Sequence, residues 1–192
     1  MRLYLLRHGV TDNNQGHIFQ GQIDTPLNDD GVREAREEGS LVRAAELTFT
    51  KIYCSPLIRA LVTCELVTGV PRNQFMIDVR LSEIAYGPYE GKSIGDSDEG
   101  MWAFLRDPYR ADPPAGVESL QSVEKRMKSA VSDILSEAAE DDVILIGSHG
   151  IALSSLFREY ETDGLKIMLE HGKLYLSPVI GSAAGMPCKV FD

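Results

Sequence analysis

Two of the four histidines, His8 and His149, stand beside a glycine and shortly after a short apolar run. Arg7 precedes His8, and Arg59 follows a further apolar run. Guanidinium groups bind phosphoryl oxygens in a bidentate manner, and a neutral imidazole nitrogen can act as a nucleophile. The neighbouring positive charges disfavour protonation of His8. If these residues meet, their types favour phosphoryl transfer to His8.

An alkoxide that leaves phosphorus needs a proton, so this chemistry also requires an acid close to His8. Glu83, within the segment Leu81-Ser82-Glu83-Ile84, is the candidate. An incoming phosphate dianion would favour the protonated form of Glu83, which could then donate to the leaving group.

Three short apolar runs, 3–6, 52–54 and 143–146, are each followed by one of these candidate residues. Continuous β-rich runs of this length are typical of buried parallel strands. Because the carboxyl ends of parallel strands meet at one edge of a sheet, we expect the two histidines and two arginines to share one pocket.

Helical patterns alternate with these runs and predict an α/β domain with a mainly parallel sheet. In the second predicted helix we expect Pro56 to stand in the first turn, where proline is tolerated. The end of the chain, 173–190, predicts a hairpin at the edge of the sheet. The predicted helices span residues 29–46, 56–67 and 120–135.

Residues 85–118 interrupt this alternation, since they are rich in Gly, Pro and Asp and contain five aromatic residues. We expect one weak helix near 101–105. An insertion beyond the carboxyl ends of the strands would form a lid or a wall that determines specificity. The chain as a whole, 1–192, is predicted to be one domain carrying this insertion.

The formal net charge is −10, which disfavours nucleic acid and anionic membranes as partners. No apolar run approaches the ~20 residues that span a bilayer, and the apolar start is too short for a signal peptide, so a cytoplasmic protein is expected. The three cysteines form no C-x-x-C pair. Two arginines beside the histidines would repel a divalent cation, so no metal is predicted.

Five segments in order resemble the histidine phosphatase superfamily, whose members include cofactor-dependent phosphoglycerate mutases. The match covers about residues 2–156, and no cofactor is implied for a phosphatase of this kind. The segments are Leu6-Arg7-His8-Gly9 through Asn14, Gln20-Gly21 through Leu27 with Gly31, Ser55 through Ala60 with Thr63, Glu83 with Gly87, Glu90 and Gly91, and Ser148-His149-Gly150.

This resemblance implies a three-layer sandwich in which helices flank the sheet. It implies that His8 is the phosphorylated nucleophile, that Arg7, Arg59 and His149 bind the phosphate, and that Glu83 is the acid and base. On the substrate side the resemblance implies Asn14, Gln20 and Gly21. The histidines outside the motifs, His17 and His171, are expected to have surface or structural roles.

Three functions remain open at this point. A phosphatase acting on a small phosphorylated metabolite is favoured, because the family's mutases, as the resemblance implies, have longer chains than this one. A phosphoglycerate mutase is the alternative, and a non-catalytic phosphate-binding module is the third. The sequence identifies neither the substrate nor the oligomeric state.

Overall fold

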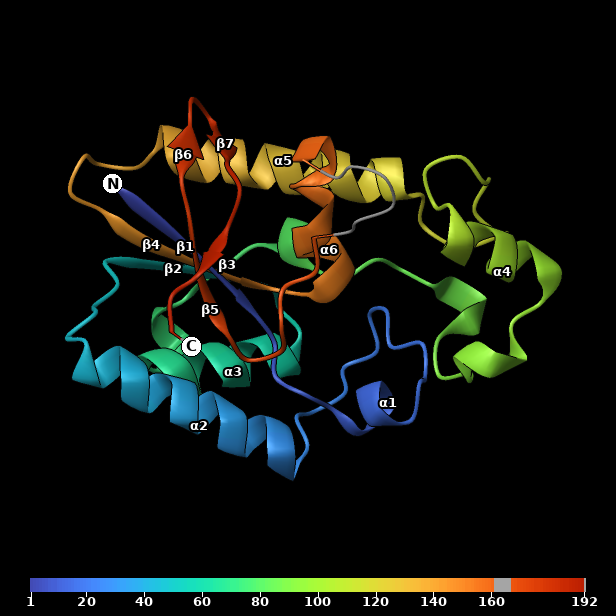
Figure 1. The fold of residues 1–192 in the computed structure, drawn as a ribbon, viewed down its shortest axis with the longest axis horizontal. Helices are drawn as coiled ribbons and strands as arrows, with labels where there is room; N and C mark the ends of the chain where they lie inside the picture. The colour runs from blue at the N-terminus through green and yellow to red at the C-terminus, as the bar shows by residue number, and fades with distance from the viewer. Residues whose placement is uncertain (161–166, 192) are drawn as a thin grey trace.

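The computed structural model describes residues 1–160 and 167–191 of the chain. A six-stranded sheet with the order β3-β2-β4-β1-β5-β8 forms the middle of the molecule (Figure 1). Its four parallel strands are β1 (Arg2–Arg7), β2 (Lys51–Cys54), β3 (Met76–Ile77) and β4 (Val143–Ser148). The antiparallel strands at one side are β5 (Leu174–Ser177) and β8 (Cys188–Lys189), and a separate pair is formed by β6 (Val179–Ile180) and β7 (Ala183–Ala184).

Helices cover both faces of the sheet, which confirms the predicted three-layer α/β fold (Figure 1). Successive side chains of β1 point to opposite faces. Leu3 and Leu5 join one buried apolar core, and Tyr4 and Leu6 join the other. One face of the sheet is covered by α5 (Leu120–Ser136) and α6 (Gly150–Ser155). The other face is covered by α2 (Asp29–Ala44) and α3 (Ile58–Thr68). Two short helices, α1 (Asp12–Gln15) and α4 (Glu99–Arg106), lie beyond the edge of the sheet.

The helix after β2 begins later than predicted. Leu57 is the N-cap of α3, so Pro56 lies in the turn before the helix rather than in its first turn. The Ile58 N–H donates to Asp24 Oδ1 at 2.6 Å, and this contact from a distant segment sets the start of the helix. None of the helices in the described ranges is both long and apolar enough to cross a bilayer.

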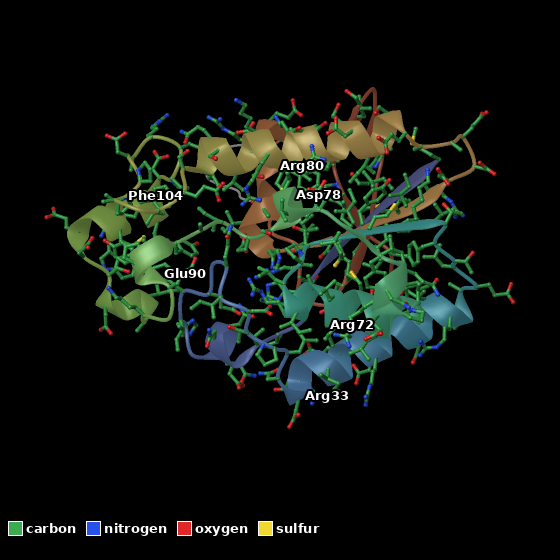
Figure 2. The ribbon with its side chains drawn as sticks, turned by 180° about the vertical axis from the view of Figure 1, so that it is seen from behind. Arg33, Arg72, Asp78, Arg80, Glu90 and Phe104 are labelled. Carbon is green, nitrogen blue, oxygen red and sulfur yellow. The ribbon has the colours of Figure 1, made fainter. Side chains whose placement is uncertain are left out.

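The insertion packs against the loop that follows β1. The expected helix near 101–105 is present as α4, with Asp98 as its N-cap and Phe104 buried (Figure 2). Backbone bonds join Phe19 to Lys92 and to Gly91. Short 3₁₀ helices occur at Arg72–Gln74, Val79–Leu81, Gly87–Tyr89, Ile94–Asp96 and Arg158–Tyr160.

Candidate active site

The ends of three parallel strands meet at one edge of the sheet, as the sequence predicts. Arg7 pairs with Ser148 across β1 and β4, and Cys54 pairs with Gly147 across β2 and β4. A cavity of about 200 Å³ opens at this edge. It is lined by Arg7, His8, Asn14, Ile18, Phe19, Gln20, Gly21, Arg59, Glu83, Tyr86, Ile94, Gly150, Ile151 and Met168.

His8 lies at the cavity with 3% of its surface exposed. Its Nδ1 is 2.7 Å from the Gly9 carbonyl oxygen, which can only accept a hydrogen bond. The proton is therefore on Nδ1, and Nε2 carries a free lone pair. Burial, assisted by the charges of Arg59 and Arg7, holds the pKa of His8 well below its usual range. The ring is thus neutral and suited to nucleophilic attack.

Arg7 and Arg59 flank this ring, and backbone carbonyls anchor both guanidinium groups. Arg7 Nη1 donates to the Leu169 carbonyl at 2.8 Å. Arg59 is fully buried and donates from Nη1 to Ile23 O and from Nη2 to Gly21 O, each at 2.7 Å. Burial lowers the pKa of both arginines, yet a guanidinium remains charged in proteins.

His149 lies behind His8 and does not line the cavity, with the two ring centroids 5.1 Å apart. Its Nε2 is 2.7 Å from Ser55 Oγ. The Ser55 hydroxyl can donate to or accept from this nitrogen, and the contact holds the ring in place. Burial, followed by the effect of His8, holds the pKa of His149 well below its usual range.

Glu83 is held at the cavity by backbone N–H groups. Its Oε1 accepts from Ile84 and Ala152, each at 3.0 Å, and its Oε2 accepts from Ile151 at 3.2 Å. The single, longer bond leaves Oε2 the freer oxygen for proton transfer. Two nearby carboxylates of the insertion, Glu90 and Glu118, do not line the cavity.

Unpartnered buried nitrogens gather around His8. Within the described residues, four buried side-chain nitrogen or oxygen atoms lack a hydrogen-bond partner: Arg7 Nε, Arg59 Nε, His149 Nδ1 and His171 Nε2. Buried polar atoms are normally paired, and each exception calls for an explanation. Arg7 and Arg59 line the cavity, so their two unpartnered charged donors match a ligand with several acceptor oxygens, whereas the rings of His149 and His171 pack against His8.

The predicted substrate side is a loop held by the insertion. Asn14 Oδ1 accepts from the Thr11 N–H at 3.1 Å, and the Thr11 hydroxyl lies 2.9 Å from Gln20 Oε1, to which it can donate its one proton. Glu90, labelled in Figure 2, accepts at 3.0 Å from the N–H groups of both Gln22 and Tyr86. Glu90 thus ties the loop to the insertion.

His171, expected to have a surface or structural role, packs against the candidate nucleophile. Its ring centroid is 5.4 Å from that of His8, and burial followed by the charge of Arg7 lowers its pKa to about 4. The next residue, Gly172, donates its N–H to the carbonyl of Arg7 at 3.0 Å. Because β5 runs antiparallel beside β1, the residues that precede β5 arrive at the end of β1. The hairpin predicted over 173–190 could have located His171, if its first strand had been expected to pair with the strand that precedes His8. His17, in contrast, is exposed and outside the cavity lining.

Arg126 of α5 is a further residue that the motifs did not indicate. It donates to the backbone carbonyls of Arg80, Ser82 and Glu83 at 2.6–3.1 Å. It also forms two hydrogen bonds with the Glu118 carboxylate, at 2.9 and 3.0 Å. Arg126 therefore positions the segment that carries Glu83.

The site thus combines a neutral histidine whose Nε2 is free with two arginines on a three-layer α/β fold, an arrangement suited to phosphoryl transfer. A family model of the histidine phosphatase superfamily (branch 1) matches residues 3–174. The chain belongs to this superfamily.

Similar proteins include both mutases and phosphatases by name. A 2,3-bisphosphoglycerate-dependent phosphoglycerate mutase of Azorhizobium caulinodans is 32% identical over 164 residues, which cover 80% of this chain and 78% of that protein. The solved structure of Bacillus stearothermophilus YhfR is 28% identical with a TM-score of 0.81, covering 95% of this chain and 93% of that one. A mycobacterial glucosyl-3-phosphoglycerate phosphatase is 25% identical with a TM-score of 0.75, covering 92% of each chain.

Proposed function

We propose that the protein is a phosphomonoesterase that works through a phosphohistidine at His8. The observation that supports this proposal is that Arg7 and Arg59, each with an unpartnered buried Nε, line the same cavity as the neutral His8 ring. These groups can bind the phosphoryl oxygens and stabilise the charge that spreads over them during transfer.

The proposed reaction has two steps. His8 Nε2 bonds to phosphorus as the ester P–O bond breaks, and protonated Glu83 gives its proton to the leaving alkoxide. A water molecule then attacks the phosphohistidine while the Glu83 carboxylate takes a proton from that water. The P–N bond breaks, and inorganic phosphate leaves with both residues restored.

Rapid-quench labelling tests this mechanism. Turnover of a ³²P-labelled monoester should give an acid-labile, base-stable phosphoprotein that His8→Ala abolishes. His17→Ala is the matched control and should keep the label, because His17 is exposed and outside the cavity lining. A stable label on another residue would refute the mechanism.

The same experiment separates the alternatives. A phosphoglycerate mutase would form the same phosphohistidine but return the phosphoryl group to a hydroxyl, giving isomerised product with little phosphate release. The mutase named among the relatives keeps this alternative open. A non-catalytic module would bind phosphate or vanadate without labelling His8.

We further propose that turnover needs no divalent metal ion. Arg7 and Arg59 supply at the cavity the positive charge that a metal would otherwise supply. Activity should therefore persist in EDTA. Loss of activity in EDTA with recovery on adding a divalent ion would refute this part of the proposal.

A further inference from the structure

The cavity has two chemically different halves. The phosphate end is formed by His8, Arg7, Arg59 and Glu83. Away from that end the lining is mainly apolar or aromatic, and comprises Ile18, Phe19, Tyr86, Ile94, Ile151 and Met168. The group attached to the phosphate must therefore lie against this second half.

The apolar wall is preformed at its aromatic part. Phe19 is 2% exposed, and its ring centroid lies 4.8 Å from that of Tyr86. The backbone of Phe19 is bonded to Lys92 and Gly91 of the insertion. Contacts from two distant segments thus fix the wall. An apolar group can therefore bind without the entropic cost of ordering the side chains of the wall.

Within residues 1–160 and 167–191, the wall carries no charged side chain that could pair with a second anionic group. The basic residues of the described lining are Arg7, Arg59 and the neutral His8, and all three belong to the phosphate end. Two cations near the insertion are engaged elsewhere. Lys92 Nζ lies 5.5 Å from the Tyr89 ring centroid, and Arg126 is paired with Glu118.

Neutral and acidic groups occupy the remaining positions near the phosphate end. Asn14 and Gln20 are amides, whose oxygens accept bonds from Thr11. Glu83 lines the cavity as a potential carboxylate. Because these amide oxygens face Thr11, Asn14 and Gln20 can offer only neutral N–H donors to a carboxylate on the substrate, and such donors stabilise a desolvated carboxylate less than a guanidinium or ammonium group would.

The size of the cavity limits the attached group. A volume of about 200 Å³ is below the roughly 300–1,000 Å³ of pockets for drug-sized ligands. Ile151 and Met168 also line a neighbouring cavity of about 40 Å³ with Pro108 and Leu120. Ser154 and Ser155 line this neighbouring cavity as well, so the surface beyond the main cavity is partly apolar and partly polar.

We propose that the site selects monophosphate esters of small, neutral, apolar alcohols and discriminates against esters that carry a second anionic group. This selectivity rests on the proposed phosphatase function. It separates the protein from enzymes whose substrate carries a carboxylate, such as a phosphoglycerate.

Matched esters test the selectivity directly. Benzyl phosphate and 4-carboxybenzyl phosphate have closely similar leaving groups and differ mainly in the carboxylate. We expect kcat/KM to be at least about 10²-fold higher for benzyl phosphate, because one buried unpaired charge costs several kcal/mol. Butyl phosphate should likewise be preferred to 3-phosphoglycerate.

A cation placed on the wall should reverse part of this preference. Ile94→Lys should raise the ratio of kcat/KM for 4-carboxybenzyl phosphate to kcat/KM for benzyl phosphate by at least about tenfold, which corresponds to about 1.4 kcal/mol. Ile180→Lys is the matched control, because Ile180 is 60% exposed on β6 and outside the cavity lining. It adds the same charge to the molecule and should leave the ratio unchanged.

The possible outcomes are distinct. Equal or better turnover of the carboxylated esters, with phosphate release and a labelled His8, would overturn the selectivity and leave the phosphatase function standing. An effect of Ile94→Lys that the Ile180→Lys control matches would also overturn it, since the net charge would then be responsible. Absence of turnover with every ester, and of His8 labelling, would overturn the phosphatase function and the selectivity together.

Discussion

At the scale of single residues, His8 shows how the fold sets the state of a reactive group. The Gly9 carbonyl places the ring proton on Nδ1, and burial beside two arginines keeps the ring neutral. His149 is also buried and neutral, with its Nδ1 unpartnered. The site thus presents one nitrogen lone pair and several donors to an incoming phosphoryl group.

The acid can be tested through the leaving group. Glu83→Gln should lower kcat for alkyl phosphates by about 10²–10⁴-fold, because their leaving groups need a proton. The loss should be much smaller for p-nitrophenyl phosphate, whose leaving group is stable as an anion. Vanadate affinity should change little, since Arg7 and Arg59 remain in place. Equal losses on both esters, with chemistry rate-limiting, would show that Glu83 is not the acid.

His171 should act by positioning the nucleophile. Its ring packs edge-on against His8, so His171→Ala should lower kcat, by up to about 10²-fold, through misplacement of His8. His171→Phe keeps a ring and should recover much of the activity if packing is responsible. Steady-state kinetics with His17→Ala as control measures the effect. An unchanged kcat in His171→Ala would contradict this role.

At the scale of elements, the site is completed by segments that the sheet does not contain. The loop after β1 is tied to the insertion through Glu90, and Arg59 of α3 binds two carbonyls of the same loop. Arg126 of α5 holds the segment that carries Glu83. Side chains from two helices and the insertion therefore fix the loops at the cavity.

Two glycines with positive φ, Gly21 and Gly69, allow the effect of displacing a cavity loop to be distinguished from the effect of backbone strain alone. Gly21 has φ +50°, and a Cβ there would lie 2.1 Å from Glu90 Oε1. Gly69, after α3, has φ +72° and no atom within 4 Å of such a Cβ. An L-residue in this region costs roughly 1–2 kcal/mol, so both alanine variants should be less stable.

Only Gly21→Ala should also lose activity, by at least about tenfold, because its carbonyl binds Arg59 at the cavity. Thermal unfolding and kcat/KM, measured on both variants, test this expectation. Equal activity in the two proteins would show that the loop tolerates the displacement of Glu90.

At the scale of the whole molecule, three histidines with lowered pKa values, His8, His149 and His171, link folding to pH. His8 and His149 are 3% and 0% exposed, and both have pKa values well below the usual range. The unfolded chain takes up protons on them below about pH 6.5, whereas the folded chain does not. The free energy of unfolding should therefore be highest above about pH 6.5, as far as these groups are concerned, and should decrease as the pH falls below that value.

Between about pH 6.5 and 5, each of these histidines should lower the free energy of unfolding by up to about 1.4 kcal/mol per pH unit. Urea denaturation at several pH values measures the slope. A His8→Asn, His149→Gln double variant should show a shallower slope over this range. An unchanged slope in that variant would assign the effect to other groups.

The sequence alone determined the nucleophile candidate, the two arginines, the acid candidate and the three strands that bring them to one edge. These are local patterns, since each residue follows a short buried strand within a few positions. The helix predicted over 120–135 is likewise present as α5, and its apolar residues are buried. Geometry common to all parallel sheets then placed Arg7, His8, Arg59 and His149 together.

Only the tertiary structure decided the surroundings of these residues. His171 reaches His8 because β5 pairs antiparallel with β1, and Arg126 reaches the carbonyl of Glu83 across 43 positions of sequence. The apolar wall arises where the insertion meets the loop after β1. Contacts between distant segments leave no periodic trace in either segment, so the protonation of His8 and the shape of the cavity emerge only when the chain is folded.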